Sequence, residues 1–135
     1  MNKLTEAVLE FLNIMNDNNF NKLLEIIDEM YQNNEIIPVP AYYFGKEKGF
    51  TFEEIRTING DIVLLSMLSE PEFYEDRGNN SQLLGMSIRM FFANYFSSDR
   101  FAGIVINPNT DMELPLPNSE IIKLKLYKDF EKQTK

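Results

Sequence analysis

Two short, fully apolar runs constrain the fold of this chain more than any other feature. Ile62–Leu65 and Phe101–Ile106 contain no polar side chain. A strand with one exposed face alternates apolar and polar residues, whereas an uninterrupted run is typical of a strand covered on both faces. We therefore expect two buried strands, with Ile104 and Val105 pointing to opposite faces and both buried. Strands of this kind need cover on each face, which favours an α/β fold.

Apolar residues spaced three and four apart predict helices at residues 2–15, about 20–32, 81–96 and about 118–132. The segment Asn16–Asn19 separates the first two, because short amide and carboxylate side chains favour turns and helix caps. The helix over Ser81–Phe96 is the strongest, and its apolar surface is wide enough for a buried or interface helix. The last helix has an alternative, since Ile121–Tyr127 also alternates like a strand.

Strands are also expected at residues 36–44, 50–58, 61–68 and 113–117. The dipeptide Asn59-Gly60 predicts a hairpin between two of them, because both residues tolerate a positive φ. Pro38 and Pro40 have no N–H to donate, so they should lie where a strand needs no pairing, at its start or at an edge. Proline at position 71 suits a short helix within the acidic segment Glu70–Asp76.

These elements predict a single domain over residues 1–135, of class α/β (α+β). It should contain a mixed sheet of about four or five strands with helices packed on it. Residues 1–17 are expected to form an N-terminal helical extension and residues 18–133 the core. The apolar fraction of 44% and the charged fraction of 25% are typical of a globular domain of this length.

The composition excludes several classes of chemistry. The chain has no histidine and no cysteine, which excludes disulfides, Cys or His zinc sites, thiol nucleophiles and the Ser-His-Asp triad. The net charge is −8, which disfavours nucleic acid and anionic membranes. The interpretation that we favour is a charge that keeps the chain soluble, and the alternative is a surface for a basic protein partner. With no long apolar run and no basic N-terminal leader pattern, the expected location is the cytoplasm. No cofactor is expected.

The turn after the second apolar run is the most interesting polar cluster. Asn107 and Asp111, with Glu113, follow the carboxyl end of a buried strand, where open α/β sheets place ligands. These three residues are therefore candidate contacts for a ligand or a partner. The alternative, which we favour, is a structural β-turn in which Pro108 fixes φ and Asn107 bonds its own backbone two residues on.

Two other groups are candidate partner contacts. Glu70 and Glu72 belong to a run of four acids that could meet a basic partner, and catalysis by these carboxylates is not expected without a nearby nucleophile. Tyr42 and Tyr43 are neighbours in a predicted strand, so both cannot lie on one face. One of them should reach a second surface, although core packing is the favoured role for this aromatic group, which also includes Phe44, Phe50 and Phe52.

A calcium loop is the one metal site that the spacing suggests. Asp17–Asn21 carries oxygen ligands at alternate positions, but Lys22 stands where such a loop needs glycine. We therefore expect a break between helices there, and no metal site.

The segment Phe101–Pro108, with the sequence Phe-Ala-Gly-Ile-Val-Ile-Asn-Pro, resembles the signature of the SseB-type family, the N-terminal domain of the enhanced serine sensitivity proteins. The order of elements is similar to that family over roughly residues 18–133. One departure is Met67-Leu68-Ser69, where the family has a Phe-Thr-Ser-like turn. The longer members also carry an additional C-terminal domain. The resemblance implies an α/β fold with a mixed sheet, and little about chemistry.

The leading functional hypothesis is a non-enzymatic, bacterial, cytoplasmic protein-binding or adaptor module of the SseB type. Its partner is expected to be a protein, a basic one or a second copy of the chain. Two alternatives remain open. One is a small-molecule sensor that uses the turn after Ile106, and the other is an acidic immunity-type inhibitor of a basic toxin.

Overall fold

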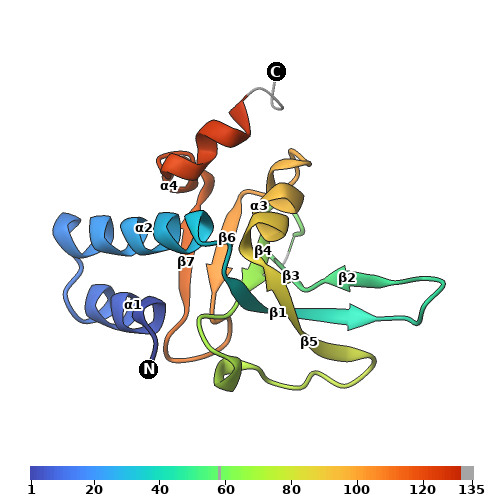
Figure 1. Cartoon of the computed structure of the whole chain (residues 1–135). Coiled ribbons are helices and arrows are strands. Elements are labelled where there is room, and N and C mark those ends of the chain that lie inside the picture. Colours follow the sequence, from blue (N-terminus) through green and yellow to red (C-terminus); the bar gives the residue numbers. More distant parts are fainter. Residues whose placement is uncertain (58, 132–135) are drawn as a thin grey trace.

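Two β-sheets that meet along one strand organise the chain (Figure 1). The structure is a computed structural model and describes residues 1–57 and 59–131. Its α-helices are α1 (Lys3–Asn13), α2 (Asp17–Gln32), α3 (Ile88–Phe96) and α4 (Asn118–Ile121). Two short 3₁₀ segments, η1 (Pro71–Phe73) and η2 (Lys125–Asp129), complete the helical elements.

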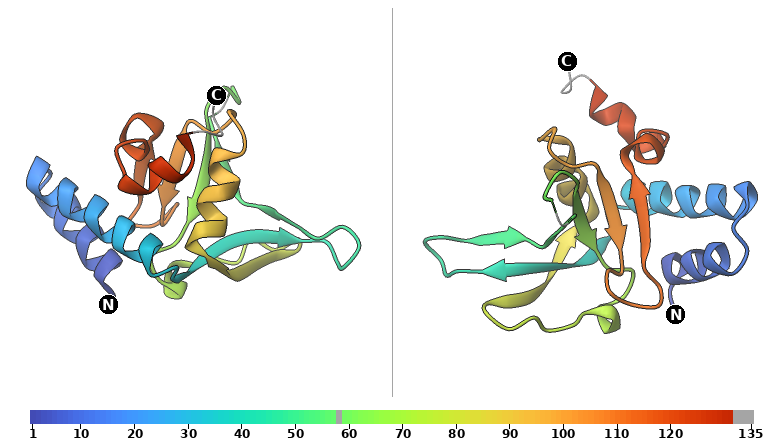
Figure 2. Two further views of the ribbon diagram at one scale, coloured as in Figure 1. Left: turned by 45° about the horizontal axis from the view of Figure 1, so that its top comes forward. Right: turned by 180° about the vertical axis from the view of Figure 1, so that it is seen from behind.

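The first sheet is antiparallel, with the order β2-β1-β5, and it extends away from the helices (Figure 2). Its strands are β1 (Ile36–Tyr43), β2 (Phe50–Phe52) and β5 (Ser81–Ser87). The second sheet has the order β3-β4-β6-β7 and consists of β3 (Glu54–Arg56), β4 (Val63–Met67), β6 (Gly103–Ile106) and β7 (Leu114–Pro117). It is mixed, because β4 and β6 are parallel while the other pairs are antiparallel. The α/β class is therefore confirmed, with the strands divided between two sheets.

The strand β1 joins the two sheets through its prolines. The carbonyl of Pro38 accepts a hydrogen bond from Leu68 N at 3.0 Å, and that of Pro40 accepts one from Glu53 N at 3.1 Å. This side of β1 pairs with β2 only from Ala41 onward. On this side of β1, Leu68 and Glu53 donate to the proline carbonyls, so the N–H groups that Pro38 and Pro40 lack are not needed for pairing. The strand β1 is nevertheless the central strand of its sheet and not an edge.

The core lies between one face of the four-stranded sheet and the helices. Leu65 of β4, Ile104 of β6 and Leu116 of β7 face it, and α1, α2 and α3 cover them with Val8, Ile27, Phe91 and other apolar side chains. Ile104 and its neighbour Val105 are 1% and 2% exposed. Because successive strand residues point to opposite faces, β6 is buried on both, as its apolar run predicts.

Asparagine side chains cap the two N-terminal helices. Asn2 Oδ1 accepts from Thr5 N at the start of α1, and Asn16 Oδ1 accepts from Asn19 N at 2.8 Å at the start of α2. The second helix therefore begins at Asp17, three residues before the predicted start at Phe20. The capping asparagine, rather than the first apolar residue, sets this boundary.

The helix predicted over Ser81–Phe96 is wrong for its first half. Residues 81–87 form β5, which pairs with β1 along its whole length, and the helix begins only at Ile88. Ser87 is the helix cap, since its hydroxyl accepts from Met90 N. Gly85 lies within the segment and weakens a helix, while the long ladder with β1 stabilises a strand there.

The final helix is also shorter than predicted. The helix α4 ends at Ile121 with Pro117, rather than Asn118 or Ser119, at its cap, and the chain continues as η2. Asp28 of α2 accepts from Lys125 N at 3.0 Å and Leu126 N at 2.9 Å, which fixes the start of η2 against α2. The predicted end at Lys132 lies outside the described residues.

The hairpin predicted at Asn59-Gly60 is present between β3 and β4. Gly60 has a φ of 76°, and its N–H donates to Thr57 O at 2.8 Å. Thr57 N in turn donates to Ile62 O, so the connection is longer than a two-residue turn. Ile58 lies outside the described residues.

Candidate functional site: an aromatic arm beside an acidic loop

Asn107 is buried and joins two strand exits. It follows β6 directly, is 0% exposed and has a φ of 54°. Its Oδ1 accepts from Ser69 N at 2.8 Å, and its Nδ2 donates to Ser69 Oγ at 3.0 Å. Its partner is thus the segment after β4, not its own backbone two residues on. With its amide used in this way, Asn107 holds the parallel pair β4–β6 together at its carboxyl end.

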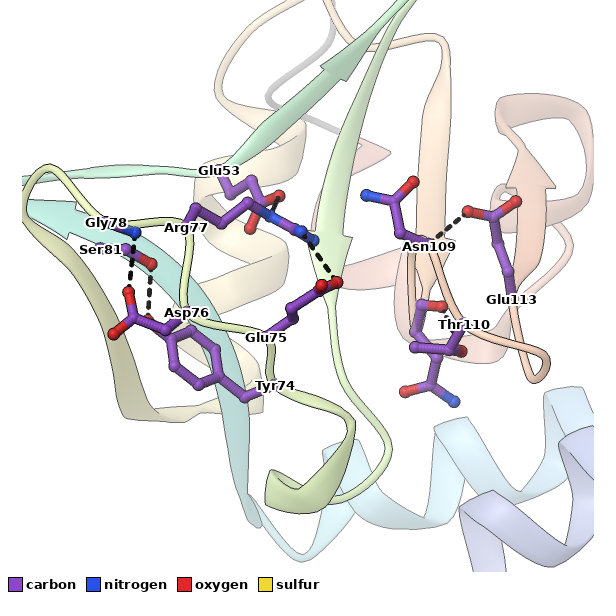
Figure 3. A network of polar contacts seen from close by, with 11 residues as sticks. Glu53, Tyr74, Glu75, Asp76, Arg77, Gly78, Ser81, Asn109, Thr110 and Glu113 are labelled. Atoms are coloured by element: carbon purple, nitrogen blue, oxygen red, sulfur yellow. Dashed lines mark hydrogen bonds and ion pairs between the residues drawn. The ribbon is translucent and has the colours of Figure 1, made fainter.

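Asp111 and Glu113 lie on the surface of the same turn. Both residues are exposed, and Glu113 Oε1 accepts from Asn109 N at 2.7 Å (Figure 3). Thr110 Oγ1 donates to Asn107 O at 2.8 Å and tightens the turn. The three predicted contact residues therefore separate into one buried structural amide and two exposed carboxylates.

Glu70 and Glu72 lie in the segment Glu70–Asn80, which we call the acidic loop. Glu70 Oε2 accepts from Asn2 N at 3.0 Å, which ties the loop to the start of α1. The hydroxyl of Thr5, together with Glu72 and Asn2 N, lowers the pKa of Glu70 to about 2. The hydrogen bond and the charge of Glu70 raise the pKa of Glu72, so Glu72 takes up a proton first as the pH falls.

An ion-pair cluster holds the middle of the acidic loop against the sheet (Figure 3). Arg77 Nε lies 2.8 Å from Glu53 Oε1, and Arg77 Nη1 lies 3.2 Å from Glu75 Oε2. Glu53 is only 6% exposed. Burial lowers the pKa of Arg77, but its bonds to Glu53 and Glu75 outweigh burial and raise the pKa, so the guanidinium stays charged. The contact between Arg77 and Glu53 was not predicted from the sequence, because the two residues are far apart in the chain.

The loop continues to the start of β5 through two further contacts. Asp76 Oδ1 accepts from Gly78 N at 2.8 Å, and Tyr74 Oη shares a hydrogen bond with Ser81 Oγ. Asn80 O then accepts from Tyr43 N of β1 at 2.9 Å. The acidic loop therefore runs beside the first sheet and reaches the hairpin that carries the candidate tyrosines.

That hairpin, residues 41–52, is called the aromatic arm here. Tyr43 is 41% exposed, Phe44 46% and Phe50 41%, whereas Tyr42 is half-buried. Tyr43 and Phe50 are cross-strand partners, so their side chains share one face of the hairpin. Phe44 N donates to Gly49 O at 2.8 Å, which places Phe44 at the end of the same hairpin. The favoured prediction that this group packs in the core is wrong for these three rings. Phe52 does pack against the core, through an edge contact with Phe91.

The polar groups described above form hydrogen bonds and ion pairs with one another. Within residues 1–57 and 59–131, no group of three or more carboxylates is placed to hold a metal ion. Across the same ranges, the helices are all too short or too polar to cross a bilayer. What the arrangement offers is surface: three exposed aromatic side chains on one hairpin, which the end of the acidic loop contacts at Tyr43.

Comparison of the chain with known proteins found no match. No family model matches the chain, and neither a curated protein nor a solved structure matches it. The resemblance of Phe101–Pro108 to the SseB-type signature therefore stays a prediction.

Proposed function

We propose that this chain is a protein-binding module rather than an enzyme, with the aromatic arm as its main contact surface. The exposure of Tyr43, Phe44 and Phe50 on one projecting hairpin carries the proposal. Exposed aromatic rings on one hairpin leave apolar surface in water, and such surface is typical of protein interfaces. An adaptor role of the SseB type is compatible with this surface, as part of the same proposal.

The partner should be a protein with an apolar patch and basic groups beside it. The acidic loop carries Glu70, Glu72, Glu75 and Asp76, and it reaches the arm at Tyr43. The tip itself is mixed, with Lys46 and Lys48 around Glu47, so the negative charge lies on the loop side of the arm. A basic toxin inhibited by this chain is a narrower form of the same proposal.

A small-molecule site after Ile106 has less support. Asn107, the amide that such a site would use, is fully buried and bonded to Ser69. A ligand would have to break these bonds to reach it, at the cost of leaving buried groups unpaired.

The test compares capture of host proteins by matched variants. The triple variant Tyr43→Ser, Phe44→Ser, Phe50→Ser removes the rings of the arm, while Ile14→Ser with Met15→Ser removes exposed apolar side chains far from it. We expect the original chain and the Ile14/Met15 variant to retain the same specific proteins from a host lysate and the arm variant to lose them. Equal retention by all three chains contradicts the proposal.

A further inference from the structure

The strand β5 presents a free edge of the first sheet. It is the end strand of the order β2-β1-β5 and pairs only with β1. Ile88 N donates to Glu35 O across this ladder, so the backbone groups of even-numbered residues face β1. The N–H groups of Leu83, Gly85 and Ser87 therefore point away from the sheet. Within the described chain, none of these three has a backbone or side-chain acceptor.

The other three sheet edges carry features that block the addition of a strand. The strand β2 is only three residues long, β3 carries Glu54 and Arg56, and β7 contains Pro115 and Pro117. Asn118 N donates to Ala102 O, so these two prolines remove N–H donors from the outer edge of β7. Short strands, charges and prolines are the devices by which proteins protect exposed edges.

β5 has none of these features. Its sequence, Ser-Gln-Leu-Leu-Gly-Met-Ser, contains no charge and no proline. Its register with β1 runs from Ser81 to Ser87 without a bulge. Gly85 is exposed and Leu83 half-buried, so the edge is accessible in its middle. An edge left open where the other three are protected is typical of a site for strand addition.

The charge beside this edge identifies the occupant. Ser81 N, which points away from β1, donates to Gly78 O, and Gly78 N donates to Asp76 Oδ1. The end of the acidic loop, with the Asp76 carboxylate, therefore lies beside the free edge of β5 at Ser81. A second copy of the chain would bring another molecule of charge −8 to this side. A segment that carries lysine or arginine is favoured there instead, because opposite charges attract across an interface.

We propose that β5 binds an extended, basic segment of a partner protein by strand addition. The segment pairs with the backbone of Leu83, Gly85 and Ser87, and its basic side chains face the acidic loop. This inference rests on the proposed protein-binding function, but it does not require the rings of the aromatic arm.

The probe is a phage-displayed library of random linear peptides, selected on the original full chain at low salt. Leu83→Pro removes the first of the three outward N–H groups and leaves the ladder with β1 intact, since Leu83 N does not face β1. Leu83→Ala is the matched control, because it removes the side chain and keeps the N–H. We expect selected peptides to combine alternating apolar residues with lysine or arginine, and to bind Leu83→Pro at least about tenfold more weakly than Leu83→Ala, the equivalent of a lost hydrogen bond.

Amide hydrogen exchange of the original chain keeps the test decisive if Leu83→Pro does not fold. Bound peptide should protect the amides of Leu83, Gly85 and Ser87. The inference is overturned if no peptide is selected, if peptides leave these three amides unprotected, or if the amides are protected by dimerisation of the chain alone. If captured host proteins require the rings of the aromatic arm and yet leave the β5 amides unprotected from exchange in their complex, that result overturns this inference while the proposed function stands.

Discussion

At the scale of single residues, asparagine determines where this chain turns. The non-glycine residues described with a positive φ are Asn34, Asn79, Asn80, Asn107 and Asn109. Asparagine tolerates the left-handed region better than other side chains, because its short amide bonds locally. The turn predicted at Asn107 is one of these positions. Composition alone does not show which of them is buried. Asn107 is buried, and its amide bonds Ser69 just beyond the ends of the paired strands β4 and β6.

Replacing Asn107 should reveal that difference. Asn107→Ala removes the bonds to Ser69 and leaves a buried N–H unpaired, so we expect a loss of about 1–3 kcal/mol in unfolding free energy. Asn109→Ala is the matched control, since its φ of 63° imposes the same backbone strain while the residue is exposed. Urea denaturation of both variants measures the difference. Equal losses for the two variants contradict a structural role for the Asn107 amide.

Tyr95 should make the fold sensitive to alkaline pH. Its hydroxyl donates to Asn118 Oδ1 at 2.8 Å, and burial raises its pKa well above the ordinary value of 10.0. The unfolded chain therefore loses this proton first, and the stability present below pH 10 falls as the pH rises above it. We expect the original chain to lose up to about 1.4 kcal/mol per pH unit more than Tyr95→Phe in this range.

Urea unfolding of both chains at about pH 8 and about pH 11 checks this expectation. Burial and Asp129 also raise the pKa of Tyr31, but that residue is present in both chains and cancels in the comparison. Parallel loss of stability in the two chains shows that Tyr95 is not the group responsible.

At the scale of elements, local patterns predict most of the chain, and long-range pairing decides the rest. The apolar runs, the asparagine breaks and the Asn59-Gly60 turn identify β4, β6, α1 and α2 because each signal is local. The helix prediction is wrong for Ser81–Ser87, because the spacing of Leu83, Leu84 and Met86 fits a helix as well as a strand. Its ladder with β1 involves residues 36–42, far away in sequence. Gly85 and the Ser87 cap were the local signals against a long helix.

The close approach of β6 and β7 explains the glycine in the Phe101–Pro108 segment. A Cβ atom added at Gly103 would lie 2.3 Å from Leu116 O, whereas one added at Gly85 would meet only the side chain of Ile36, at 3.2 Å. Both glycines lie in strands without a positive φ. We expect Gly103→Ala to lower the unfolding free energy by about 1–3 kcal/mol or more and Gly85→Ala to lower it by less, measured by chemical denaturation. A Gly103→Ala chain as stable as the original contradicts the observed spacing of β6 and β7.

At the scale of the whole molecule, the fold separates a core, between the four-stranded sheet and the helices, from an exposed β hairpin. The candidate surface combines residues 41–52, 70–80 and 81–87, and only their contacts in the fold bring them together. From sequence, the acids and the aromatic cluster could be named as candidates, since their residue types are unusual in such density. Their adjacency and the free edge of β5 could not be predicted, because both depend on the pairing of β1 with β5.

The acidic loop should act on the rate of partner binding, since charges beside an interface attract a partner over the roughly 8–10 Å that salt leaves unscreened. Replacing Glu70 and Glu72 with Gln, Glu75 with Gln and Asp76 with Asn changes the net charge from −8 to −4 and keeps every hydrogen-bond acceptor. We expect slower association with a basic partner and a weaker salt dependence, measured by stopped-flow at two salt concentrations. The control removes the same charge from exposed positions on α1 and α2, by Glu6→Gln, Glu10→Gln, Asp17→Asn and Glu25→Gln. If both sets of substitutions change the association rate equally, net charge alone steers the partner and the loop has no specific role.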